Sequence, residues 1–168
     1  MKNPILICFI LLAFLLPACK VRLSMSGVDL GAAKTVSVNY FQNNASLSKP
    51  TYSATLTESL KDALTSQSPL TLANHGADLQ FEGSVTAYAV TPIAISSGTD
   101  QAALNRLTIT VSVKFTNNKD EKKNFESSFT RYADFPSTTN LNAAEDGLIK
   151  TINDQLVQDI FNKALINW

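Results

Sequence analysis

Hydrophobic and polar residues alternate most regularly near the middle of the chain, along residues 104–116. Every second position there is apolar: Leu107, Ile109, Val111, Val113 and Phe115. Because successive side chains of a strand point to opposite faces of a sheet, this pattern predicts a half-buried β-strand. The same period, less regular, predicts strands over residues 34–41, 78–90 and 121–132, and residues 70–72 fit a short edge strand.

Two other stretches repeat their apolar residues at spacings of three and four, which is the period of an amphipathic helix. They span residues 51–66 and 141–168. The predicted order of the main elements is therefore β-α-β-β-β-α. We expect an α+β fold, a two-layer sandwich with a four-stranded, mostly antiparallel sheet and two helices on one face. Since a helix joins the first two strands, these two are expected to be parallel neighbours.

Within the predicted strand 78–90, the alternation assigns side chains to two faces. Leu79, Ala87 and Ala89 fall on the apolar face, whereas Tyr88 falls on the opposite face. Gly83 lies in the apolar register. A glycine inside a strand marks either a bulge or a close packing contact, and both alternatives stay open here.

Residues 91–103 then break the alternation and predict a loop. Its tip carries Pro92, Ile93 and Ile95. Apolar side chains at a loop tip are unfavourable in water, so we expect them to be covered. They are a candidate contact with a partner protein, and burial under the domain's own core is the equal alternative.

The first nineteen residues have the layout of a bacterial lipoprotein signal. Lys2 precedes an apolar run over residues 5–16, which is too short to cross a bilayer because a spanning helix needs about 20 residues. The sequence LPAC that ends at Cys19 resembles a lipobox, in which the cysteine is acylated and anchors the mature protein. A plain signal peptide with a chance cysteine is the alternative. The expected organisation is a signal peptide at residues 1–18, a lipidated tether at residues 19–33 and a single domain at residues 34–168.

Composition excludes several classes of function. Without the signal peptide the chain has thirteen basic and fourteen acidic side chains, which argues against nucleic-acid binding. Cys8 lies in the signal and Cys19 is the lipid site, so no thiol remains for a disulfide, a metal site or a nucleophile. The single histidine, His75, precedes Gly76 and fits a turn, and the sequence contains no catalytic or phosphate-loop motif. We therefore expect a protein that is not an enzyme and that holds no metal and no cofactor.

Two surfaces remain as candidates for function. The sheet face away from the helices is lined by Thr108, Thr110, Ser112, Lys114, Ser128 and Thr130. It is either an ordinary solvated face or a polar interface against another protein or the water-lined interior of a barrel. Near a predicted hairpin turn at residues 117–120 lies a basic group made of Lys114, Lys119, Lys122 and Lys123. These lysines either hold phosphates by charge-assisted hydrogen bonds or solubilise and protect the sheet edge.

Several short segments follow one another in an order and at a spacing that are similar to those of one family. Each segment alone is a weak signal, and the order and spacing carry the similarity. After LPAC the segments are TVSVNYF (35–41), LTESL (56–60), DLQFEG (78–83), NRLTI (105–109), YADF (132–135) and DIFNKALINW (159–168). Together they resemble the LptE family of lipopolysaccharide-assembly lipoproteins, over almost the whole mature chain. The resemblance implies a two-layer α/β domain that acts without catalysis.

The resemblance also implies partners and a location. LptE-like proteins sit in the lumen of LptD, a large outer-membrane β-barrel, help it to assemble and assist delivery of lipopolysaccharide to the cell surface. They are also thought to bind lipopolysaccharide. The family supplies no short motif for that contact here, so the candidates for its phosphates are physical ones, Arg106 and the four lysines named above. Lys20 follows the lipobox cysteine, where an aspartate would have indicated inner-membrane retention, and this favours the outer membrane.

Two other functions fit the same sequence. A small α/β lipoprotein can act as a periplasmic interaction module that regulates another envelope process, such as cell-wall synthesis. A carrier for a small lipid would need a cavity between the sheet and the helices. Large inward side chains indicate that this space is filled, namely Phe81, Phe115, Phe125, Phe129 and Phe161.

Overall fold

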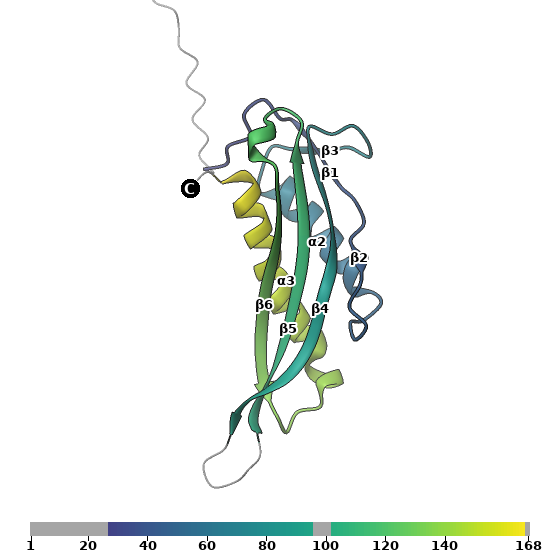
Figure 1. Cartoon of the computed structure of the whole chain (residues 1–168), viewed down its shortest axis with the longest axis vertical. Helices are drawn as coiled ribbons and strands as arrows, with labels where there is room; N and C mark the ends of the chain where they lie inside the picture. The colour runs from purple at the N-terminus through teal and green to yellow at the C-terminus, as the bar shows by residue number, and fades with distance from the viewer. Residues whose placement is uncertain (1–26, 96–101, 167–168) are drawn as a thin grey trace, which may run out of the picture.

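Three long strands form the body of the sheet in the computed structural model, which describes residues 27–95 and 102–166 (Figure 1). They are β4 (Leu79–Ile95), β5 (Ala102–Asn117) and β6 (Phe125–Pro136). Both neighbouring pairs are antiparallel, and β5 lies between the other two. A single turn of 3-10 helix, η1 (Glu121–Lys123), connects β5 to β6.

Three short strands extend the sheet beside β4. β1 (Thr35–Val38) pairs in parallel with both β4 and β3 (Thr71–Leu72), and β2 (Gln42–Asn43) pairs in parallel with β4 further along. The sheet is therefore mixed and has six strands, in the order β3-β1-β4-β5-β6 with β2 also beside β4. The expected four-stranded, mostly antiparallel sheet is wrong in this respect. Strands of two residues are too short to show a period, and their pairing comes from the path of the chain.

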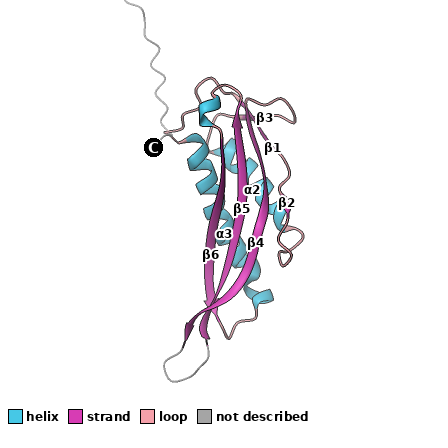
Figure 2. Cartoon of the chain, viewed as in Figure 1, coloured by secondary structure: helices cyan, strands magenta, loops and turns pink. Residues whose placement is uncertain are grey.

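Two helices cover one face of the sheet, as the sequence predicts (Figure 2). They are α2 (Tyr52–Ser66) and α3 (Leu141–Leu165). In the chain, α2 lies between β2 and β3, and the predicted parallel pairing of β1 with β4 is confirmed. α3 starts where the Asn140 side chain accepts a hydrogen bond from the Asn142 N–H, and its buried residues recur every three or four positions from Ile149 onward.

Aromatic rings fill much of the space between the sheet and the helices. Phe81 and Phe115 are buried, and their ring centroids are 4.8 Å apart. The ring centroid of Phe125 lies 5.3 Å from that of Phe115, and Phe161 on α3 is buried in the same core. This row occupies the space in which a lipid carrier would need its cavity.

A β-bulge reverses the facing of β4 halfway along the strand. The register against β5 shifts between Val85 and Ala87. Beyond it Ala87 and Ala89 are exposed, whereas Tyr88 is buried toward the helices. The predicted facing of these three residues is therefore wrong, because one extra residue on a strand moves every later side chain to the other face.

The expected loop at residues 91–103 is also largely wrong. β4 continues to Ile95 and β5 already begins at Ala102, so Pro92 lies opposite Asn105 in the ladder. This end of β4 lies beyond the reach of β1 and β2, and only β5 pairs with it within the described residues. A proline is tolerated in a strand where one side has no ladder to complete.

Gly83 is confirmed as a close packing contact. A Cβ atom at this position would lie 2.2 Å from the backbone oxygen of Ser112 and 2.8 Å from Cε1 of Phe41. Both distances are shorter than real Cβ contacts allow. A glycine therefore lets the Phe41 ring, between β1 and β2, pack against the middle of the sheet.

The predicted signal peptide, the lipidation site Cys19 and the first part of the predicted tether lie outside the described residues. The last part of the tether packs on the domain, since Val28 and Ala33 are buried. Val28 forms a bridge with Ile166, and Asp29 Oδ2 lies 2.7 Å from Lys123 Nζ. Within residues 27–95 and 102–166, no helix is long and apolar enough to cross a membrane.

Candidate functional site

The sheet face opposite the helices, called the polar face below, carries short hydroxyl side chains in cross-strand rows. Alternation along β5 and β6 places there the six residues that the sequence predicts. Thr110 is paired with Thr130, and their Oγ1 atoms are 3.0 Å apart. Ser112 is likewise paired with Ser128. The polar face therefore presents cross-strand rows of hydroxyl donors and acceptors.

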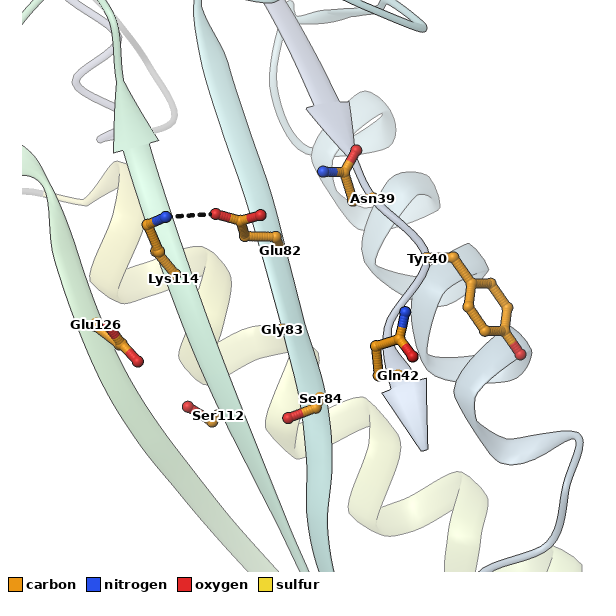
Figure 3. A pocket seen from close by; sticks show the side chains of 9 residues that line it. All are labelled: Asn39, Tyr40, Gln42, Glu82, Gly83, Ser84, Ser112, Lys114 and Glu126. Carbon is orange, nitrogen blue, oxygen red and sulfur yellow. Dashed lines mark ion pairs between the residues drawn. The ribbon is translucent and has the colours of Figure 1, made fainter. Parts of the chain in front are cut away.

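A groove of about 320 Å³ opens on the polar face where β1 gives way to β2 (Figure 3). Its lining residues are Asn39, Tyr40, Gln42, Glu82, Gly83, Ser84, Ser112, Lys114 and Glu126. Figure 3 shows two amide side chains on the β1–β2 bank, while the Tyr40 ring points away from the groove. The hydroxyls of Ser84 and Ser112 lie further along β4 and β5 than the Glu82–Lys114 ion pair.

The one cation in this groove is paired, and with two carboxylates beside it the groove has a net charge of −1. Lys114 Nζ lies 2.7 Å from Glu82 Oε1, and Glu126 lies opposite Lys114 in the ladder. The hydrogen bond to Glu82, with a smaller contribution from the charge of Glu126, raises the pKa of Lys114. Because the cation is already matched by carboxylates, the groove suits a neutral polar partner better than a phosphate.

A second cluster lies further along β5, toward its beginning. The Arg106 guanidinium donates to both carboxylate oxygens of Asp134, at 2.7 Å and 2.9 Å, and stacks over the Tyr132 ring at 3.6 Å from its centroid. These hydrogen bonds raise the pKa of Arg106 and lower the pKa of Asp134. Tyr132 is 51% exposed, so the cluster presents an aromatic ring with a paired cation to the surface.

Two of the lysines near the hairpin also form ion pairs with carboxylates. Lys119 Nζ lies 2.9 Å from Asp78, and Lys123 Nζ lies 2.7 Å from Asp29. The backbone N–H of Lys34, together with Lys119 and Thr35, holds the pKa of the Asp78 carboxyl well below its usual range. The hydrogen bond from Lys123 also lowers the pKa of Asp29. These ion pairs fasten the connection between β5 and β6 to the start of β4 and to the segment before β1.

The five basic candidates do not form one site. Lys119, Lys122 and Lys123 lie in and around η1, whereas Lys114 belongs to the groove. Arg106 is separated from the hairpin by most of β5, roughly 35 Å at the rise of an extended strand. A single small ligand cannot touch Arg106 and the hairpin lysines at once.

The apolar end of the β4–β5 hairpin is exposed. Ile93 is 39% exposed, and Val90 and Leu104 beside it are 38% and 36% exposed. Pro92 is exposed too, and the side chain of Ile95 lies outside the described part of the structure. The sequence left two alternatives for this segment, a contact with a partner protein and burial under the domain's own core. In the structure, Ile93 is not buried under the core.

Sequence reasoning missed the pairing of these charges. The alternation places Glu82 and Lys114 on the same face, but their contact depends on the register of β4 against β5. Tyr132 lies two residues after Thr130 in the same strand and therefore shares its face, which the sequence alternation could have shown. No group of three or more potential metal ligands occurs among the residues that the structure describes.

Comparison with known proteins adds the family to this geometry. A family model for LptE, described as lipopolysaccharide-assembly, matches residues 33–164. The chain belongs to the LptE family. At the level of the family its role is therefore lipopolysaccharide assembly. No curated protein sequence matches the chain.

Solved structures of bacterial lipoproteins share the fold of this LptE-family chain. A minor lipoprotein from Acinetobacter baumannii is 19% identical with a TM-score of 0.51, covering 80% of this chain and 97% of that one. An uncharacterized lipoprotein B from Nitrosomonas europaea is 14% identical with a TM-score of 0.52, covering 77% of this chain and 80% of the other. At these identities the likeness extends to the fold alone.

Proposed function

We propose that this LptE-family chain is an outer-membrane lipoprotein subunit of the lipopolysaccharide transport machinery. It acts without catalysis as the plug and assembly partner of an LptD-like β-barrel, with the domain on the periplasmic side and within the barrel lumen. Family membership supports the process, and the polar face of the sheet supports the mode of action.

The observation that carries the proposal is the chemistry of the polar face. The interior of a large outer-membrane barrel is polar, so a plug needs a surface that hydrogen-bonds without a large net charge. The rows Thr110–Thr130 and Ser112–Ser128, and the internally paired Lys114, have this character. A surface of this kind loses little on leaving water, since barrel side chains replace its hydrogen bonds.

Two arginines in the middle of the polar face test this mode. Ser112→Arg with Ser128→Arg adds bulk and two charges where the strands present hydroxyls. We expect at least tenfold less barrel to co-purify with this variant from detergent-solubilised outer membranes. The control is Thr65→Arg on the exposed surface of α2. Equal recovery of the barrel with all three proteins, each folded by circular dichroism, would contradict the polar face as the interface.

Anchoring through Cys19 is the second component of the proposal. Acyl chains on this cysteine would hold the mature protein at the bilayer, because each buried CH₂ contributes about 0.8 kcal/mol. Cys19→Ser is expected to move the protein that is not bound to the barrel from the outer-membrane fraction to the soluble periplasmic fraction. Incorporation of labelled palmitate into the wild type and not into the variant identifies the site.

Direct contact with lipopolysaccharide is the third component, and it assigns phosphate contacts to Lys119, Lys122 and Lys123. A phosphate there competes with Asp78 and Asp29 for two of the three lysines. Replacing all three with glutamine is expected to weaken lipopolysaccharide binding by about tenfold, as each charge-assisted hydrogen bond contributes only part of the affinity.

The matched control replaces Lys61 and Lys150, which lie on the helices, with glutamine. The same assay applied to Lys114→Gln and Arg106→Gln tests the other two candidates. Affinities unchanged by the triple replacement would remove the hairpin lysines from the ligand site.

The exposed apolar end of the β4–β5 hairpin is proposed as a partner contact, through Pro92, Ile93 and Ile95. Ile93→Asn is expected to reduce recovery of the barrel complex while leaving the isolated domain folded, since this side chain is already 39% exposed. Depletion of the protein separates the leading proposal from a role in cell-wall synthesis. Loss of surface lipopolysaccharide supports the former, and altered peptidoglycan synthesis with normal surface lipopolysaccharide supports the latter.

A further inference from the structure

The groove on the polar face is built from two neighbouring rows of side chains that run across the sheet. The charged row lies over β4, β5 and β6 and consists of Glu82, Lys114 and Glu126. The uncharged row lies over β2, β4 and β5 and consists of Gln42, Ser84 and Ser112. On β4 and β5 the two rows are two residues apart, so they share one face of the sheet and lie side by side.

Within the charged row, one carboxylate is paired and the other is not. Lys114 Nζ lies 2.7 Å from Glu82 Oε1, and Figure 3 shows Glu126 apart from this ion pair. The charge of Glu126 acts on Lys114 at longer range, but Glu126 itself forms no ion pair within residues 27–95 and 102–166. Its side chain is exposed at the margin of the groove. One acidic group is therefore left to meet a charge from outside the domain.

The uncharged row adds hydrogen-bonding groups that the domain does not use. The side chains of Gln42, Ser84 and Ser112 form no hydrogen bond in the part of the chain that the structure describes. The same holds for Asn39, the other amide on the β1–β2 bank. Polar groups in an interface hydrogen-bond to the partner or to trapped water. The groove thus offers several oxygen acceptors beside one unpaired carboxylate.

The width of the groove suits a long side chain. Neighbouring strands lie about 4.8 Å apart, so the backbones at Gln42 on β2 and Glu126 on β6 are about 14 Å apart. Between them the floor carries the short side chains of Ser84 and Ser112. A side chain that enters along this floor reaches the Glu126 carboxylate without displacing Lys114 from Glu82.

A guanidinium group matches these acceptors better than other polar groups do. It carries a positive charge and five N–H donors in one plane, and it accepts no hydrogen bond. Two parallel donors fit a carboxylate, and the remaining donors are directed at neighbouring oxygens. Since the groove has a net charge of −1, a phosphate would be repelled. A neutral side chain would leave the charge of Glu126 unmatched.

We propose that this groove receives an arginine side chain of the protein that docks on the polar face. The guanidinium pairs with Glu126 and donates to Ser112, while the amides of Asn39 and Gln42 hydrogen-bond to the partner's backbone nearby. The inference rests on the proposed function, in which the partner is an LptD-like barrel. It adds that the lumen wall of the barrel carries an arginine at this point. Such a charged contact fixes the orientation of the docked domain.

Titration of the full-length lipoprotein in detergent micelles with N-acetyl-arginine amide tests the site without the barrel. The backbone amide NMR shifts of residues Ser84, Ser112 and Glu126 report binding. N-acetyl-citrulline amide is the matched probe, because it has nearly the same shape and no charge. We expect the arginine probe to bind about threefold more tightly than the citrulline probe, which is the effect of one exposed ion pair.

Three variants assign the effect to the charges of the groove. Glu126→Gln should lower the affinity for the arginine probe to that for the citrulline probe. Lys114→Gln releases Glu82 and should raise the affinity for the arginine probe by about threefold. Glu121→Gln is the matched control, because this exposed carboxylate lies in η1 and outside the groove, and it should change neither affinity.

Glu126→Arg tests the same contact in the complex, with Glu121→Arg as its control. A second arginine facing the partner's arginine should lower recovery of the barrel from solubilised outer membranes by about tenfold, since like charges repel in an interface. Circular dichroism checks that both variants are folded.

The remaining outcomes each count against a defined part of the argument. Equal affinity for the two probes, or an affinity for the arginine probe that Glu126→Gln leaves unchanged, overturns the site. Selective binding of the arginine probe together with full barrel recovery by Glu126→Arg overturns the assignment of the arginine to the barrel. If the wild type recovers no barrel, the proposed function fails, whereas the titration still decides whether the groove binds a guanidinium.

Discussion

A single methyl group at Gly83 should destabilise the domain strongly. Gly83→Ala places a Cβ atom 2.2 Å from the Ser112 backbone oxygen and 2.8 Å from Cε1 of Phe41. The nearer atom belongs to the backbone of β5, in the middle of the sheet, and so it cannot turn aside as a side chain would. Either the two strands separate locally or Phe41 and the short strand that follows it shift away.

The cost of that change can be bounded from known substitutions. Overpacking a core by a methyl group costs about 1–3 kcal/mol, and a contact with backbone belongs at the upper end of this range. Alanine also loses less conformational entropy than glycine on folding, which returns about 0.5–1 kcal/mol. The net expectation is a loss of about 2 kcal/mol in the free energy of unfolding, and a melting temperature lower by about 8 °C.

Urea unfolding followed by circular dichroism measures this loss, and Gly147→Ala is the matched control. Gly147 is exposed on α3, and nothing lies within 4 Å of a Cβ atom there, so the same substitution should stabilise by about 0.5–1 kcal/mol. Opposite signs at the two glycines are the expected result. A change at Gly83 below about 0.5 kcal/mol would refute the reasoning. Full rescue of Gly83→Ala by Phe41→Leu would also contradict it, because that change leaves the Ser112 oxygen in place.

Two further predictions concern polar groups that fasten the sheet. Tyr88→Phe removes the hydroxyl that donates to the buried carboxylate of Glu145, which keeps its ion pair with Lys49, and should cost about 1–2 kcal/mol in urea unfolding. A loss below about 0.5 kcal/mol would show that the hydroxyl contributes little beyond packing. Asp78 has a folded-state pKa below its unfolded value, so its contribution to stability is present above about pH 4 and is lost as the pH falls through the folded value. Asp78→Asn should therefore be less stable than the wild type at pH 7, with the difference shrinking below pH 4 in unfolding titrations, and a constant difference would contradict this account.

Local patterns were sufficient to predict the long elements. The alternation from Leu107 to Phe115 and the three-and-four spacing along α3 each record burial on one side, which the structure confirms. When one face of a helix or strand is buried, apolar residues recur along that element with the period of the helix or strand, and this period can be read from the sequence of the element alone. The family resemblance rests on the same residues and is likewise confirmed.

Contacts between distant residues account for what these patterns missed. The extra residue before Ala87 reverses the later half of β4, and nothing in the local alternation marks where it occurs. The pairing of the two-residue strands follows from the path of the chain and not from propensity: β2 lies beside β4 before α2 begins, and β3 lies beside β1 after α2 ends.

The candidate site depended on the same kind of information. Lys119 and Lys123 were recognisable as a basic group, but their partners Asp78 and Asp29 are far away in sequence. An ion pair is set by distance in space, because the Coulomb energy of two charges depends on their separation and surroundings. The residues of the chain thus specify its elements, its family and its polar face, while the folded arrangement specifies which charges are already paired and which are not.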